Sequence, residues 1–238
     1  MNRREVTQGE LDRLIDAQEL PQLRADRLKQ IESAVIADLR PVRPMASDGV
    51  YVGALAGIFI AICIVSCYLI AGRDGWEALS NLQRPVVFIP LLAIASLLAF
   101  SLVRQMRPAA KYVRTTALFG AGVFILLIAS VVLIFHPMQE TAFAHDSLVC
   151  FRAGMMFAIP TAILFGIVLW RGAALSPALT GATAGGLAGL AGLTVLEIHC
   201  PNMNVYHIVV AHLSVVVVCA LAGFIFSSVT FSRRWSNH

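Results

Sequence analysis

The chain alternates between long apolar runs and short polar segments, and a polar stretch precedes the first run. Six runs are long enough to form helices, and their approximate limits are 50–71, 86–103, 115–135, 149–170, 174–198 and 205–231. A helix needs about 20 mostly apolar residues to cross the hydrocarbon core of a bilayer. The pattern therefore predicts an all-α membrane protein with a six-helix transmembrane domain over residues 50–231 and a short tail at 232–238.

Residues 1–49 form a polar arm before the first run. Thr7 and Glu10 have the spacing of a capping box, which predicts the start of a helix. Pro21 suits the first turn of a second helix. One narrow apolar stripe follows on that helix, and it consists of Leu28, Ile31, Val35 and Leu39. The stripe needs the other arm helix, a second chain or a partner protein to cover it, and docking into a groove of a partner uses such a stripe.

The composition supports the membrane assignment. Hydrophobic residues make up 58% of the 238 residues and charged residues only 13%, whereas a soluble domain is about a quarter charged. The net charge of +4 does not indicate nucleic-acid binding, because the basic residues gather at the ends of the predicted spans. No cleavable signal peptide is apparent, so the first span is expected to act as the targeting signal.

Lys and Arg residues are unevenly distributed between the loops. The arm, the loop after the second span, the loop after the fourth span and the tail carry most of them. The loops at 72–85, 136–148 and 199–204 carry few. Because cytoplasmic loops are enriched in Lys and Arg, both termini are predicted to lie in the cytoplasm and these three loops outside.

Two cysteines are predicted to lie at the same depth. The fourth and fifth spans form an antiparallel hairpin, and Cys150 and Cys200 lie at nearly equal distances along the chain from its short inner loop. Helices rise by the same 1.5 Å per residue, so both thiols are expected at the outer face on adjacent helices. Such positions can satisfy the geometry of a disulfide, and oxidation persists outside the cytoplasm. The alternative is two unrelated thiols in apolar surroundings.

Other polar side chains are expected near the same face. The histidines among them are His136, His145, His199 and His207. Together with the two thiols, some of these could form a soft metal site, for which His145 and His199 are the candidates. The alternative is interfacial histidines bonded to water or backbone. Asp146 and Glu197 lie at the same edge, where they could tune the pKa of the thiols or bind metal, but they are expected to be solvated interface residues.

The fifth span repeats a glycine at every fourth position, at Gly181, Gly185 and Gly189. Small residues at this spacing let two membrane helices pack closely. Three further cysteines lie inside predicted spans and are expected to be small packing residues: Cys63, Cys67 and Cys219. No charged residue lies in the middle of a span, which argues against an ion pump.

Three features of the chain fit one known family. They are the segment Asp38–Pro44 before the first span, Cys150 at the start of the fourth span, and the stretch from Arg171 through the glycine-rich span to Pro201. Together they resemble the NrsF family of six-span negative regulators of extracytoplasmic-function sigma factors, over nearly the whole chain. The resemblance implies a bacterial inner-membrane anti-sigma factor whose cytoplasmic arm holds its sigma factor away from RNA polymerase. It also links the cysteine pair, here Cys150 and Cys200, to stress sensing and signal release.

Two other function classes are weighed against this one. A small transporter or channel would need a polar path through the spans, and the sequence shows little of one. A membrane thiol oxidoreductase would need a CxxC motif, which is absent, as are common nucleotide, metalloprotease and hydrolase motifs. The preferred interpretation is a regulator without enzymatic activity or cofactor. Its expected partners are the sigma factor and the lipid bilayer, without direct nucleic-acid contact, and self-association is left open.

Overall fold

The computed structural model describes residues 30–34, 46–70, 73–107, 113–137, 142–169 and 176–235, and it describes 113–117 and 231–235 through their backbone alone. The chain divides into two compact units, Met1–Pro44 and Met45–His238. In the first unit, residues 30–34 are helical and the Ile31 side chain is 54% exposed. The other members of the predicted stripe, Leu28, Val35 and Leu39, lie outside the described residues.

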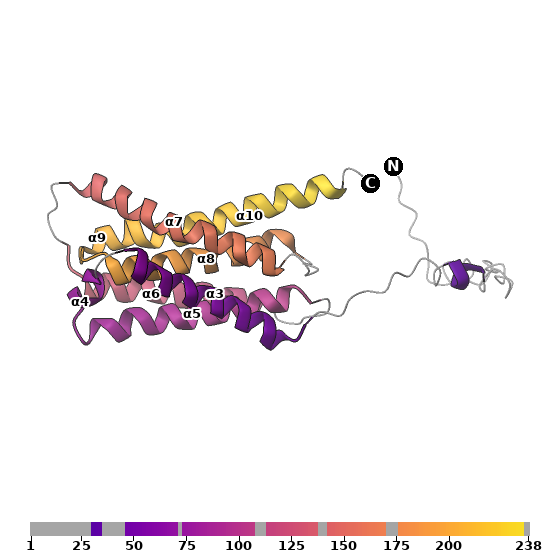
Figure 1. Ribbon diagram of the computed structural model, residues 1–238, viewed down its shortest axis with the longest axis horizontal. Helices are drawn as coiled ribbons and strands as arrows, with labels where there is room; N and C mark the ends of the chain where they lie inside the picture. Colours follow the sequence, from indigo (N-terminus) through magenta and orange to yellow (C-terminus); the bar gives the residue numbers. More distant parts are fainter. Residues whose placement is uncertain are drawn as a thin grey trace, which may run out of the picture. The chain divides into compact units, whose positions relative to one another are not determined.

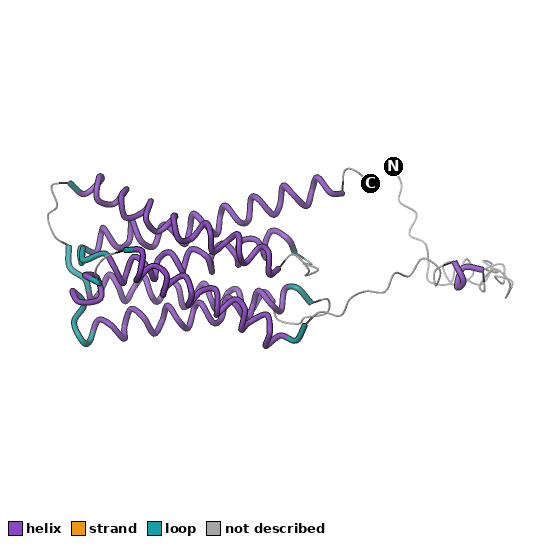
Figure 2. Tube along the Cα trace, in the orientation of Figure 1, coloured by secondary structure: helices purple, strands orange, loops and turns teal. Residues whose placement is uncertain are grey.

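The second unit is a bundle of helices (Figures 1 and 2). Its helices are α3 (Asp48–Leu69), α4 (Asp74–Ala78), α5 (Gln83–Gln105), α6 (Val113–Ile134), α7 (Phe143–Leu169), α8 (Pro177–His199), α9 (Val205–His207) and α10 (Ser214–Trp235). A π-helical segment, η1 (Ile208–Leu213), joins α9 to α10. No strand occurs among the described residues, so the predicted all-α class is confirmed.

Five of the described helices are long and apolar enough to cross a membrane: α3, α5, α7, α8 and the continuous helix Val205–Thr230. In α6 the apolar part with described side chains is shorter, Leu118–Ile134. Large apolar side chains such as Leu69, Leu133 and Phe226 are exposed on the bundle, as lipid contact requires. The fold is therefore that of a multi-pass membrane protein, and the sixth crossing stays a prediction.

The main difference from the predicted boundaries is the start of α7. Hydropathy placed the fourth span at 149–170, but the helix begins at Phe143, so Cys150 lies inside it. The added residues include the polar His145, Asp146 and Ser147, which lower the hydropathy without preventing a helix. An acidic residue in the first turn also interacts favourably with the positive end of the helix dipole.

Helix α8 is the centre of the bundle. In the apolar stretch of α8, 72% of the residues are buried inside the bundle, compared with 17% in the apolar stretch of α3. It contacts α3, α4, α5, α7 and α10 (Figure 1). Its sequence is rich in glycine and alanine, which have small side chains or none, so its neighbours can approach its backbone closely.

The closest approach is between α8 and α10. A Cβ atom on Gly185 would overlap the carbonyl oxygen of Cys219, and one on Gly189 would lie 2.6 Å from the Cα atom of Val216. A Cβ atom on Gly181 would overlap the carbonyl oxygen of Gly223. Because backbone atoms cannot move aside as a flexible side chain does, any larger residue at these positions must separate the two helices.

Replacing Gly185 by leucine is therefore expected to destabilise the bundle by about 3 kcal/mol, the upper end of the usual effect of overpacking. The thermal unfolding midpoint of the purified protein in detergent should fall by several degrees. The matched control is Gly57→Leu on α3, because a Cβ atom there meets nothing within 4 Å. Equal midpoints for the two variants would contradict the close approach of α8 and α10.

Candidate functional site

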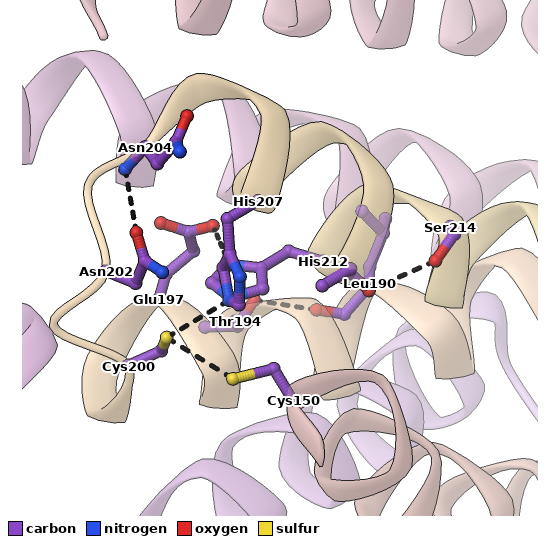
Figure 3. Close-up of polar contacts among 11 residues, drawn as sticks. Cys150, Leu190, Thr194, Glu197, Cys200, Asn202, Asn204, His207, His212 and Ser214 are labelled. Atoms are coloured by element: carbon purple, nitrogen blue, oxygen red, sulfur yellow. Dashed lines mark hydrogen bonds and ion pairs between the residues drawn. The ribbon is translucent and has the colours of Figure 1, made fainter. Parts of the chain in front are cut away.

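Reactive side chains gather at the end of the bundle where α8 finishes and the chain turns into α9 (Figure 3). The Sγ atom of Cys150, on α7, lies 3.4 Å from the Sγ atom of Cys200, which directly follows α8. Both are free thiols and partly buried. The Nε2 atom of His207 lies 3.6 Å from the Sγ atom of Cys200. We call the region around Cys150, Cys200 and His207 the cysteine end of the bundle.

The turn that carries Cys200 is fixed by local hydrogen bonds. Pro201 has no backbone N–H and cannot continue α8. The backbone N–H of Asn204 donates to the Oδ1 atom of Asn202 at 3.0 Å. The side chain of Asn204 then caps the next helix by accepting from the backbone N–H of Tyr206 at 3.1 Å. The chain therefore reverses direction at a defined place and returns beside α8.

The π-helical segment η1 brings two histidines together. His207 and His212 are five residues apart, and in a regular α-helix such residues point about 140° away from each other. A π-turn forms hydrogen bonds between residues five apart and so nearly aligns them. The two imidazole rings lie edge to face with their centroids 5.2 Å apart. Single π-turns inside α-helices often occur at functional sites.

Glu197 corrects one expectation from the sequence. It was expected to be solvated, but only 4% of it is exposed, because the last turn of α8 packs against η1. Its Oε1 atom lies 2.8 Å from the Nδ1 atom of His212, which is 1% exposed. Burying a carboxylate is costly unless it is paired, so this contact explains how Glu197 is tolerated.

His212 was not among the candidate residues from the sequence. It lies within an apolar run, where hydropathy treats it as one more residue of a span. The available signal was that an ionisable side chain inside a predicted membrane span is itself an indication of function. Its position relative to His207 could not be predicted without the π-turn.

The surroundings of Cys200 affect its ionisation. The hydrogen bond with Cys150 raises the pKa of the Cys200 thiol most, and burial raises it further. His207 and His212 act in the opposite direction but do not outweigh these two effects, so the pKa lies above its ordinary value. The two thiols are therefore coupled through one hydrogen bond.

The other candidate histidines lie around this centre. His145 and Asp146 line an open pocket of about 320 Å³ that also reaches Cys150, Cys200 and His207. His199 points elsewhere, because its Nε2 atom lies 3.3 Å from the Oγ atom of Ser66 on α3. Among the described residues, the His, Cys and acidic groups that cluster closely enough to hold a metal ion are Cys150, Cys200, His207 and His212.

The short helix α4 packs directly on this region. A Cβ atom on Gly75 would lie 2.7 Å from the carbonyl oxygens of both Glu197 and Cys200, so only glycine allows the contact. Arg84, at the start of α5, stacks 5.1 Å from the ring centre of Trp76 and donates to its carbonyl oxygen at 3.2 Å. Helix α4 therefore connects the cysteine end to α5.

Comparison with known proteins gives one result. A family model described as NrsF, negative regulator of sigma F, matches residues 36–235, which includes both cysteines and all helices from α3 to α10. Neither the comparison with curated proteins nor that with solved structures gives a match. The match covers most of the chain, so the resemblance noted in the sequence is confirmed. The protein belongs to the NrsF family of negative regulators of sigma factors.

Proposed function

We propose that this protein is an inner-membrane anti-sigma factor that holds an extracytoplasmic-function sigma factor through its N-terminal arm. A change of state at Cys150 and Cys200 releases the sigma factor. The family assignment supports the class of function. The observation that supports a sensing role for the cysteines is the 3.4 Å separation of their two sulfur atoms, because one chemical event there can act on α7 and on the end of α8 together.

The proposed topology has six spans, with α6 as the third, and both termini in the cytoplasm. The Lys and Arg residues of the loops support this orientation. The cysteine end then faces outward, where a stimulus from the cell envelope can reach it. The arm joins the bundle at the other end of α3, since Ser66 near the C-terminal end of α3 contacts His199.

A direct connection links the two ends of the bundle. Helix α5 begins beside α4 at the cysteine end and finishes at Gln105. Just beyond it, the Nε atom of Arg107 lies 2.6 Å from the Oδ1 atom of Asp48, and its Nη2 atom donates to the carbonyl oxygen of Ala46 at 3.3 Å. A partly exposed ion pair of this kind contributes at most about 1 kcal/mol, so breaking it costs little free energy. This contact lies where the arm enters α3.

The proposal is tested by co-purification. Full-length tagged protein, expressed at its native level, is expected to retain a sigma factor. Deletion of the gene that encodes this regulator should raise transcription from the promoters that this sigma factor uses. The matched control lacks residues 1–44, which form the first compact unit. It should still enter the membrane but lose the sigma factor. Retention by the shortened protein would place the binding site outside the arm.

A further inference from the structure

We propose that Cys150, Cys200, His207 and His212 form a four-ligand site for one divalent d¹⁰ cation of the zinc and cadmium class. Each residue offers one ligand atom, and these atoms all lie within 4.8 Å of one another. The inference deepens the proposed function, on which its regulatory meaning rests, by naming the chemistry that acts on the cysteine pair. The binding itself is a separate claim with its own test.

The distances fit tetrahedral coordination. Zinc binds thiolate sulfur at about 2.3 Å and imidazole nitrogen at about 2.0–2.1 Å, so tetrahedral angles place a sulfur and a nitrogen about 3.6 Å apart and two sulfurs about 3.8 Å apart, slightly farther than the thiols are without an ion. The two sulfur atoms lie 3.4 Å apart, and the Cys200 sulfur lies 3.6 Å from the Nε2 atom of His207. Two thiolates and two imidazoles are also a donor set that zinc commonly takes.

The histidines are oriented as metal ligands usually are. A ligating histidine typically donates its other ring N–H to a carboxylate or similar group, which fixes the ring and its tautomer. The Nδ1 atom of His212 bonds Glu197 at 2.8 Å, and the Nδ1 atom of His207 lies 3.4 Å from the Oγ atom of Ser147. In both rings the Nε2 atom is thereby left to face the thiols, as Figure 3 shows for the ring of His207.

An unpaired buried atom points to the same site. The Nε2 atom of His212 is buried and makes no hydrogen bond of ordinary geometry among the residues that the structure describes, and its nearby polar group is the Cys200 thiol. Buried polar groups without partners are rare in folded proteins, and a packing role does not account for this one. A cation held between this nitrogen and the two sulfurs does. The open pocket at Cys150 and Cys200, with Asp146 on its wall, gives the cation a way in.

The charges balance when the ion binds. The cation displaces one proton from each thiol, so that the two thiolates neutralise its two positive charges and two protons leave to solvent. His212 binds as a neutral imidazole that donates its Nδ1–H to Glu197, so the Glu197 carboxylate keeps one negative charge directly behind the site. Binding would draw α7, the end of α8 and η1 onto one centre, which is a differential interaction able to favour one state of the bundle.

The test titrates reduced, full-length protein in detergent with Cd²⁺, followed by the ultraviolet charge-transfer band of cadmium thiolates, and with Zn²⁺ against a competing chelator. We expect one ion per chain. Cys150→Ser and Cys200→Ser should abolish binding, while His207→Ala, His212→Ala and Glu197→Gln should each weaken it about 10- to 100-fold. The matched controls His145→Ala and His199→Ala should leave it unchanged.

A ligand swap separates coordination from folding. His212→Cys should retain the ion and strengthen the charge-transfer band, because a third thiolate then binds cadmium. The site is overturned if no ion binds, if His207→Ala and His212→Ala bind normally, or if His145 or His199 is needed instead. Binding is measured without any sigma factor, so failure of the co-purification leaves this result standing. An ion that binds as described but leaves sigma-dependent transcription unchanged would overturn its regulatory role alone.

Discussion

Replacing either Cys150 or Cys200 by serine is expected to change sigma-dependent transcription in the same direction and to the same extent. Their sulfur atoms are 3.4 Å apart, so each substitution removes the same paired unit. Coupling between two sites of a protein is typically about 1–3 kcal/mol, which corresponds to roughly 5- to 150-fold in output. The double variant should add nothing to either single variant, because residues that act as one unit are not additive. A transcriptional reporter in cells carrying each variant measures this.

The control for the cysteine variants is Cys219→Ser. Cys219 is also a free thiol, but it lies within α10, and its sulfur faces the Met155 sulfur at 3.7 Å instead of the cysteine end. Its replacement should leave the response to the stimulus intact. Additive effects of the two main substitutions, or none, would make Cys150 and Cys200 packing residues and leave the proposed sensor without its input.

Changing both Leu28 and Ile31 to aspartate is expected to weaken sigma-factor binding about 1000-fold. Each substitution places a charge in an apolar contact, and a residue at the centre of an interface often contributes 2 kcal/mol or more. Two such losses together correspond to roughly three powers of ten in Kd. Ile31 is 54% exposed in its helical segment, so it is available to a partner. Pull-down of the sigma factor by full-length protein measures the loss.

The matched control is Gln30→Asp with Ser33→Asp. These residues have the same spacing as Leu28 and Ile31, and at about 100° per residue they fall on the side of the predicted helix opposite to the predicted stripe. Both are exposed in the described segment. The control adds the same charge to the same helix and should bind normally. Equal loss in both double variants would indicate a general effect of charge, and equal retention would reject this face.

The membrane helices could be predicted because their cause is visible in the sequence. A bilayer requires a minimum length of apolar helix, so counting apolar residues located the candidate spans. The shared depth of the two cysteines followed in the same way, from equal chain lengths on either side of one short loop. The start of α7 was misplaced because Phe143 begins a helix whose first turns are polar. Helix α4 has five residues, too few to give a periodic pattern.

The inner detail of the site could not be predicted, because it depends on contacts between elements. Glu197 and His212 lie in two different predicted spans, and the packing of α8 against η1 brings their side chains together. The π-turn leaves no composition signal, since Ile208–Leu213 is as apolar as the helix that follows. Hydropathy reports whether a residue lies in a span, but it does not report which way that residue points.

The π-helical segment also determines whether His207 and His212 lie on the same side of the helix as the α10 residues that pack against α8. The α10 residues nearest to Gly181, Gly185 and Gly189 of α8 follow one line along the helix: Val216, Cys219, Gly223 and Ser227. His212 continues this line one turn earlier, and in an uninterrupted α-helix the next position on it would fall at Ile208. The wider π-turn moves His207 onto the line instead. In evolutionary terms, gaining or losing one residue in this segment is therefore enough to align or separate the two histidines, with every side chain of α8 and α10 left as it is.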